Sequence, residues 1–224
     1  WIGAIAVVAT FGLAGCHNSS DDGAATTSSS SAIATPALQP GNYPTVPQAP
    51  MGEARSGGVV IEAQRMADYV VGPWEVDADL TVPMPVSTLV LQSSAAAPLA
   101  LDEATVPVLD QHHFVNGFST VRTAASGDRE LKAVHNVVLR FPDESAATAA
   151  ASELAKLPGP DSSEAITVDN HPDTHATVVA NSDGSHEVTS WTPVGAYVIA
   201  VKAKAPKSRD AAALLVTKML DLQV

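Results

Sequence analysis

The segments HFVNGFSTVR (residues 113–122) and ELKAVHNVVLRF (residues 130–141) decide the fold of this 224-residue chain. In both segments residues of similar character recur at every second position, as Leu131, Ala133, Val137 and Leu139 do in the second segment. This period of two indicates β-strands, whose successive side chains point to opposite faces. Residues 126–128, Ser-Gly-Asp, supply the turn between them. The sequence therefore predicts an antiparallel hairpin, in which His135 lies on the apolar face of the second strand as a hydrogen-bonded core residue.

A helix is predicted directly after this hairpin. Asp143 is the candidate N-cap, and Glu144 suits the positive end of the helix dipole. The Pro-Gly-Pro sequence at 158–160 ends the helix. Its buried face is expected to consist of Ala147, Ala150, Ala151 and Leu154.

The C-terminal part of the chain repeats this order. Residues 175–180 and 186–192 flank an Asn-Ser-Asp-Gly turn at 181–184, which predicts a second hairpin. A further strand is predicted from Tyr197, and a helix is predicted to open at Pro206. The apolar stripe of this helix is expected to be Ala211, Leu215, Met219 and Leu222. The repeated order suggests two similar ββα halves, so we predict an α+β domain: an antiparallel sheet with helices packed on one face.

Upstream of these elements the pattern is less regular. Residues 59–71 predict a helix whose apolar face is Ala63, Met66, Ala67 and Val70. Core packing is the default role of this face, and the alternative is that Met66 beside Tyr69 lines a ligand pocket. Residues 74–107 show no clear period, apart from one short helix or strand near 87–92.

The N-terminal residues have the features of an export signal. Residues 1–15 are interpreted as a truncated signal peptide, because residues 2–13 are uncharged and apolar and the chain begins without Met or a basic segment. This run is shorter than the ~20 residues of a transmembrane helix. Leu-Ala-Gly-Cys at 13–16 resembles the lipobox of bacterial lipoproteins, which implies cleavage between Gly15 and Cys16 and acylation of the Cys16 thiol. The alternative is an ordinary buried cysteine.

Composition divides the rest of the chain into a tether and a domain. Residues 16–40 are rich in Ser, Thr and Ala and contain prolines, with few large apolar residues, so they predict a flexible tether after the lipidated cysteine. Residues 41–224 are assigned to the single α+β domain. Because Cys16 is the only cysteine in the chain, an internal disulfide is excluded.

The formal net charge of −12, from 12 Lys plus Arg against 24 Asp plus Glu, limits the partners. Nucleic-acid binders need a basic surface, so this class of function is excluded. The same charge argues against a domain that lies flat on an anionic bilayer. We therefore expect membrane contact through the lipid anchor at Cys16, on the extracytoplasmic face of the cell membrane.

Three segments together resemble a family of secreted lipoproteins from mycobacteria, rhodococci and their relatives. They are the lipobox, Gly-Asn-Tyr-Pro-Thr at 41–45 and Glu-Ala-Gln-Arg-Met-Ala at 62–67. This family has no assigned activity, so the resemblance implies no catalytic residues. It implies the actinobacterial cell envelope as the setting. Because members tend to be longer, it also implies further chain after residue 224.

Histidine is the one residue type that hints at chemistry. His113, His175 and His186 on paired strands are weak candidates for metal ligands, and unrelated surface histidines are the alternative. Asp110, His113 and Ser119 are close in sequence, which does not establish the geometry of a catalytic triad. The sequence contains no G-x-S-x-G, no G-x-G-x-x-G, no phosphate-binding loop and no C-x-x-C, so no cofactor is expected.

Three functions follow as hypotheses. The main one is a lipid-anchored envelope protein whose domain binds without catalysis, with an apolar small molecule or envelope lipid between sheet and helices as the ligand. The second is an envelope hydrolase that uses His113 with an acidic partner. The third is a scaffold for a protein partner. An enclosed apolar cavity would favour binding, a cleft joining His113, a carboxylate and a hydroxyl would favour catalysis, and an exposed apolar patch would favour the scaffold.

The lipobox generates a direct prediction. Cys16→Ser removes the thiol that receives the lipid, so the variant, expressed behind a complete signal peptide, is expected to leave the membrane fraction for the soluble fraction. Fractionation followed by immunoblotting measures this. Membrane retention equal to that of the Cys16 protein would contradict acylation at this residue.

Overall fold

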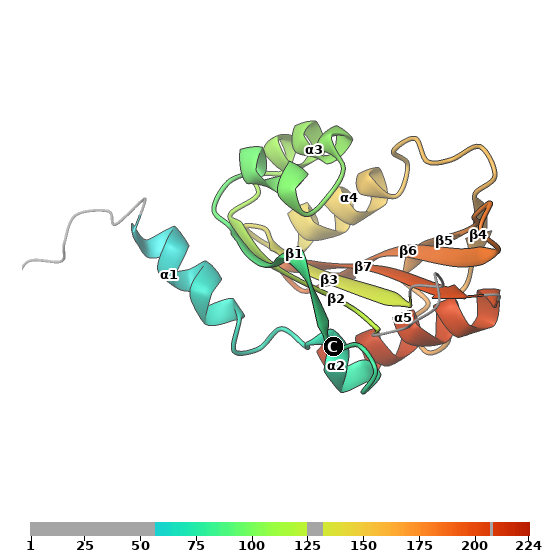
Figure 1. The fold of residues 1–224 in the computed structure, drawn as a ribbon. Helices are drawn as coiled ribbons and strands as arrows, with labels where there is room; N and C mark the ends of the chain where they lie inside the picture. The colour runs from blue at the N-terminus through green and yellow to red at the C-terminus, as the bar shows by residue number, and fades with distance from the viewer. Residues whose placement is uncertain (1–56, 125–131, 207) are drawn as a thin grey trace, which may run out of the picture. The chain divides into compact units, whose positions relative to one another are not determined.

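The structure, a computed structural model, describes residues 57–124, 132–206 and 208–224. These residues contain a seven-stranded sheet in the order β1-β2-β3-β7-β6-β5-β4, and every neighbouring pair of strands is antiparallel (Figure 1). The strands are β1 Val82–Leu91, β2 Asn116–Thr123, β3 Ala133–Arg140, β4 Glu164–Ile166, β5 His175–Ala180, β6 Ser185–Val194 and β7 Tyr197–Pro206. The α-helices are α1 Gly57–Met66, α2 Pro73–Val76, α3 Val106–Gln111, α4 Glu144–Leu154 and α5 Arg209–Gln223, with short 3-10 helices η1 Ser94–Leu99 and η2 Glu103–Thr105.

Both predicted hairpins are confirmed, and with them the antiparallel α+β fold. β2 pairs with β3 over their whole length, although the predicted turn at 126–128 lies outside the described residues. β5 pairs with β6 around a turn in which Gly184 has a φ of +81°, a conformation that suits glycine. The two hairpins join through β3 and β7, which pair from Ala133 opposite Lys204 to Arg140 opposite Tyr197.

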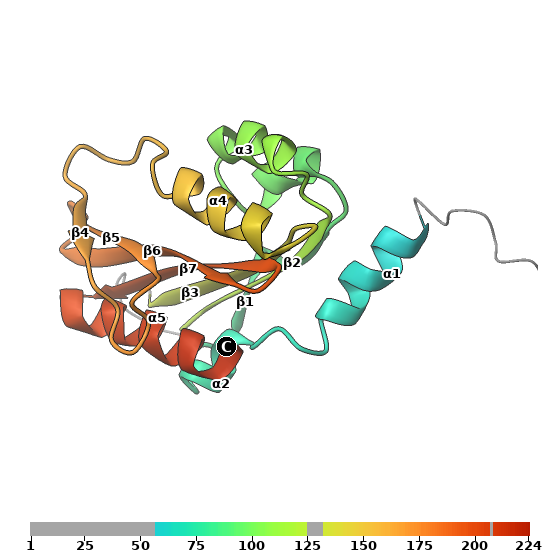
Figure 2. The same ribbon diagram turned by 180° about the vertical axis from the view of Figure 1, so that it is seen from behind.

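Helices cover both faces of the sheet, so the prediction that they pack on one face is wrong. Figure 1 shows α3 and α4 above the sheet and α2 and α5 below it, and Figure 2 shows the same two layers from behind. The face under α4 carries Val137, Leu139, Val198 and Ala200. The face under α5 carries Val134, Ile199, Val201 and Ala203. We refer to these two surfaces as the α4 face and the α5 face.

The reason is visible in the two central strands. β3 and β7 have apolar residues in immediate succession, such as Val137-Val138 and Ile199-Ala200, and these residues are buried on both sides of the sheet. A strand with consecutive apolar residues must be covered on both faces, whereas a strand with alternating apolar and polar residues must be covered on one face only. The order β-β-α does recur, in β2-β3-α4 and in β6-β7-α5. If the two halves were related by symmetry, the two-fold axis would pass between the antiparallel neighbours β3 and β7, perpendicular to the sheet. Such an axis would place α4 and α5 on the same face. Because they lie on opposite faces, the two halves are not equivalent.

The two long helices differ in how well the sequence predicts them. In α4 the Asp143 carboxylate accepts a hydrogen bond from the Ala146 backbone N–H at 2.9 Å, and the four predicted residues are the buried ones. In α5 the N-cap is Ser208, because Pro206 is still the last residue of β7. The buried residues of α5 are Ala212, Leu215, Val216, Met219 and Leu220, so the predicted stripe is rotated, and Ala211 and Leu222 are exposed.

Two strands occupy regions with weak sequence patterns. β1 contains the predicted short element near 87–92, but it starts earlier, at Val82, and it forms one edge of the sheet. β4 has three residues and forms the other edge. The predicted helix at 59–71 ends at Met66, and the chain then runs without regular structure to α2. This segment between α1 and α2 shapes the site described next.

Candidate functional site

A cavity of about 300 Å³ lies on the α5 face of the sheet, between α1 and the C-terminal end of α5. Its floor consists of Val138 from β3 and Ile199 from β7. Met66 and Val70 form one wall, in the last turn of α1 and the segment that follows it. The opposite side is formed by the β6–β7 hairpin and by Gln223 of α5. The cavity is therefore lined mainly by apolar side chains, and its size falls at the lower end of the roughly 300–1,000 Å³ typical of ligand pockets.

Polar and aromatic groups surround the entrance. Glu62 and Arg65 project from α1, where Arg65 Nη1 lies 3.4 Å from Glu62 Oε1. Tyr69 is 78% exposed and Tyr197 is 38% exposed, so both rings extend from the lining towards solvent. Tyrosine combines an apolar ring with a polar hydroxyl and suits a boundary between an apolar interior and water.

One hydrogen-bond network fixes the segment between α1 and α2. The Gln223 side-chain oxygen accepts hydrogen bonds from the Val71 backbone N–H at 2.8 Å and from the Asn136 side-chain amide at 3.0 Å. The Gln223 side-chain amide donates to the Tyr69 carbonyl at 3.1 Å. The buried Asn136 also donates to the Val71 carbonyl at 3.1 Å. Because Asn136 belongs to β3, the wall of the cavity is tied to the centre of the sheet.

α1 has its own attachments to the sheet. Ala63 is fully buried, which places that side of the helix against the protein. The Asn116 side-chain amide of β2 donates to the Val59 carbonyl at 3.4 Å, and Arg140 Nη1 of β3 lies 3.5 Å from Glu62 Oε2. These contacts hold both walls of the cavity without a ligand, so the cavity is preformed and binding would need little reorganisation.

Sequence reasoning identified part of this site. Met66 and Tyr69, for which a ligand pocket was the alternative to core packing, do line the cavity. Gln223 was missed because its partners are distant in sequence, with Tyr69 separated from it by 154 residues. Val138 and Ile199 were expected in strands, but no local signal shows which distant segments meet over this part of the sheet.

The three histidines considered as metal ligands lie apart. His113 is exposed in the turn after α3, with a left-handed φ of 57°. His175 lies opposite Trp191, at one end of the β5–β6 hairpin, and His186 lies opposite Ala180, at its other end. Their strand positions also place His175 and His186 on opposite faces of the sheet. In the part of the chain that the structure describes, no three His, Cys, Asp or Glu residues gather as metal ligands.

The proposed hydrolase residues are also not assembled around His113. The Ser119 hydroxyl lies 2.7 Å from Nε2 of His135, on the α4 face. Asp110 instead accepts a hydrogen bond from the Ser94 hydroxyl. The hydrogen bond expected of His135 is confirmed, but its side chain is half-buried and belongs to neither core cluster. Gly15 and Cys16, the predicted cleavage and lipidation site, lie outside the described residues.

Comparison with known proteins gives a family. The family model described as Domain of unknown function (DUF7373) N-terminal matches residues 50–224. The chain belongs to this family. A comparison with solved structures finds the extracellular domain of PknH from Mycobacterium tuberculosis, at 14% sequence identity and a TM-score of 0.47, covering 71% of this chain and 94% of that chain. No curated protein matches.

Among the described residues, none of the helices has both the length and the apolar character needed to cross a bilayer. The longest of them, α5, has 15 residues and alternates between a buried and an exposed side.

His135 generates a prediction about pH. Burial, and then the nearby charge of Lys202, lower the pKa of His135 from 6.5 to about 4. Between pH 6.5 and about pH 4, His135 is protonated in the unfolded chain but largely neutral in the folded protein. The free energy of unfolding is therefore expected to fall by up to about 3 kcal/mol as the pH decreases from about 6.5 to about 4.

Urea denaturation at pH 7 and pH 4.5 tests this through a variant. His135→Gln keeps an acceptor for Ser119 and removes the titration, so the difference between its two unfolding free energies should be smaller than in the parent protein. His113→Gln, at an exposed position, is the matched control and should behave like the parent. Equal pH dependence in His135→Gln and the parent would contradict the role of His135.

Proposed function

We propose that this protein is a lipid-anchored component of the cell envelope and that its domain binds an apolar or amphipathic lipid in the cavity between α1 and the sheet. The observation that carries the proposal is the preformed cavity of about 300 Å³ with Val138 and Ile199 as its floor. The floor residues Val138 and Ile199 are already buried, whereas the lining residues Met66, Val70 and Val194 are half-buried. A ligand that covers these half-buried apolar side chains removes them from water and is stabilised by the hydrophobic effect. An acyl chain is the ligand class that such walls accept.

The entrance favours a ligand with a polar end. Tyr69 and Tyr197 provide exposed rings with hydroxyls, and Glu62 and Arg65 provide charges of both signs. An acyl chain in the interior would place its headgroup among these groups, where it keeps contact with water. A purely hydrocarbon ligand would leave them without a role in recognition.

The location of the protein is part of the proposal. Leu-Ala-Gly-Cys at 13–16 supports lipid anchoring at Cys16 on the extracytoplasmic face of the membrane, and residues 16–40 would then tether the domain. The resemblance to secreted actinobacterial lipoproteins supports an envelope rich in lipids. A domain held close to a bilayer in this way has continuous access to lipid ligands.

The alternative functions have different support. The exposed side chains of Trp74, Val82, Met84 and Val86 favour a second candidate, a scaffold that meets a protein partner along the β1 edge. Prolines at positions 83 and 85 interrupt the hydrogen-bonding potential of this edge, so side-chain contacts would carry such an interaction. For a hydrolase, no contact joins His113 to an acidic partner and a hydroxyl among the described residues, and we do not propose it.

A cavity-filling variant tests lipid binding. Met66→Trp adds a ring to the wall of the cavity from a half-buried position, where the fold has room to accept it. Affinity for the fluorescent fatty acid cis-parinaric acid, followed by its own emission, is expected to fall by about tenfold or more, equivalent to about 1.4 kcal/mol.

Leu214→Trp is the matched control, because Leu214 is 53% exposed on α5 and does not line the cavity. This variant should bind the probe as the parent does. Either non-saturable binding in the parent or equal affinity in Met66→Trp and the parent would overturn the assignment of the cavity.

A further inference from the structure

A second cavity, of about 330 Å³, lies on the opposite, α4 face of the sheet. Its floor is formed by β5 and β6, where His175 lies opposite Trp191 and Thr177 lies opposite Thr189. The C-terminal end of α4 forms a wall with Ser152 in its last turn, and Ala155 and Lys156 directly follow the helix. The two cavities share no lining residue.

The lining combines one aromatic surface with several hydroxyls. Trp191 packs partly against the core under α4 and leaves the rest of its surface to the cavity. The hydroxyls of Ser152, Thr177 and Thr189 have no hydrogen-bond partner within the described part of the chain. A hydroxyl both donates and accepts, and an indole ring offers a flat apolar surface. A sugar ring matches both, because it has an apolar C–H face and peripheral hydroxyls.

The charge of this cavity differs from that of the whole protein. The chain has a net charge of −12, yet none of the described residues that line the cavity is Asp or Glu. Lys156 lines it as an exposed cation, and among the described residues no carboxylate forms an ion pair with it. The site therefore attracts an anion.

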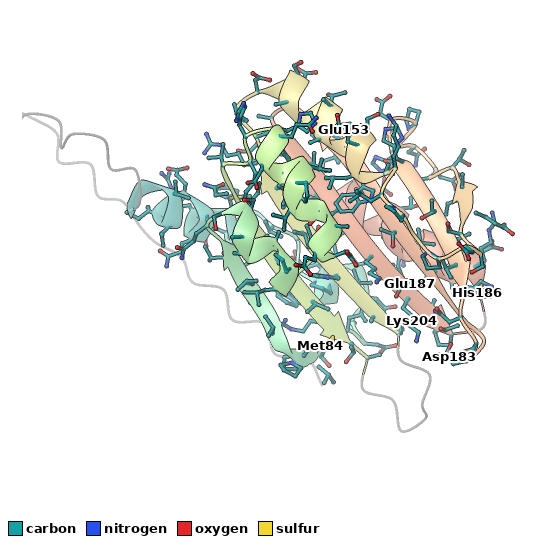
Figure 3. All side chains as sticks on the ribbon, turned by 90° about the horizontal axis from the view of Figure 1, so that it is seen from above. Met84, Glu153, Asp183, His186, Glu187 and Lys204 are labelled. Atoms are coloured by element: carbon teal, nitrogen blue, oxygen red, sulfur yellow. The ribbon has the colours of Figure 1, made fainter. Side chains whose placement is uncertain are left out.

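Other lysines on the same face form ion pairs with carboxylates. Lys202 lies 3.0 Å from Glu187, and Lys204 lies 2.9 Å from Asp183. Figure 3 looks onto this face and shows Glu187, Lys204 and Asp183 at the end of the strands that the helices leave open. Lys156 is distinguished from them by its place in a cavity and by the absence of such a pair within the described residues.

We propose that this cavity binds an anionic saccharide, with the sugar ring against Trp191, its hydroxyls bonded to Thr177 and Thr189, and its acidic group beside Lys156. His175, which also lines the cavity, adds a ring nitrogen that can form a further hydrogen bond. The small side chain of Ala155, with Ala165 from β4, leaves room for a ring between the helix and the sheet.

Heteronuclear NMR of the whole chain tests this proposal with D-glucose 6-phosphate as the probe. Titration should shift the indole N–H of Trp191 and the amides of Thr177 and Thr189, with a dissociation constant on the order of millimolar, as expected for one small ring. D-glucose and inorganic phosphate, in separate titrations, should each bind at least about fivefold more weakly. Phosphate binding as strong as that of the sugar phosphate would make this a plain anion site and overturn the saccharide assignment.

Two variants in the cavity and one control outside it test the roles of individual side chains. Lys156→Ala should reduce affinity for D-glucose 6-phosphate about fivefold and leave that for D-glucose unchanged, while Lys218→Ala, on exposed α5, should change neither. Thr189→Val keeps the shape of the side chain and should weaken both sugars. The proposal would be overturned if D-glucose 6-phosphate caused no saturable shift at Trp191, Thr177 and Thr189. It would also be overturned if Lys156→Ala bound this sugar phosphate as tightly as the parent does.

Discussion

The pairing of β3 with β7 is the contact on which the rest of this structure depends. These strands come from different hairpins, and their pairing converts two local units into one sheet. Their side chains are buried on both faces, so the sheet requires one helical layer above and another below. Small residues such as Ala200 and Ala203 allow both layers to approach closely. A polar substitution at Ala200 would disturb the core under α4, and one at Ala203 would disturb the core under α5.

The two cavities lie on opposite faces of this sheet, each beside one end of a long helix. On the α5 face, Val138 and Ile199 form the bottom of a space that Gln223 of α5 borders on one side and α1 with its following segment borders on the other. Asn136 and Gln223 keep the connecting segment at a fixed distance, so this space does not collapse. On the α4 face the helix ends at Leu154, before it reaches the outer strands. Both sites therefore depend on how segments distant in the chain meet the sheet.

Local features of the fold were predictable from the sequence because they depend on neighbours in the chain. The alternation in β2 and β3 and the turn before Gly184 define hairpins, and the Asp143 cap defines the start of α4. The face that each helix covers was not predictable, since it depends on contacts between distant segments. The bond from Gln223 to Tyr69 has no signature in either segment. The cavity itself was not predictable either, because its lining residues come from segments that are distant in the sequence.

The measurement that tests lipid binding most directly is native mass spectrometry of the protein purified from an actinobacterial host. The account predicts a co-purifying mass, in the range of an acyl-containing lipid, that remains bound under gentle conditions and leaves on denaturation. This ligand should be absent or strongly reduced when the wall residue Met66 is replaced by Trp. A parent protein that carries no bound mass and gains none on incubation with envelope lipids would contradict the account.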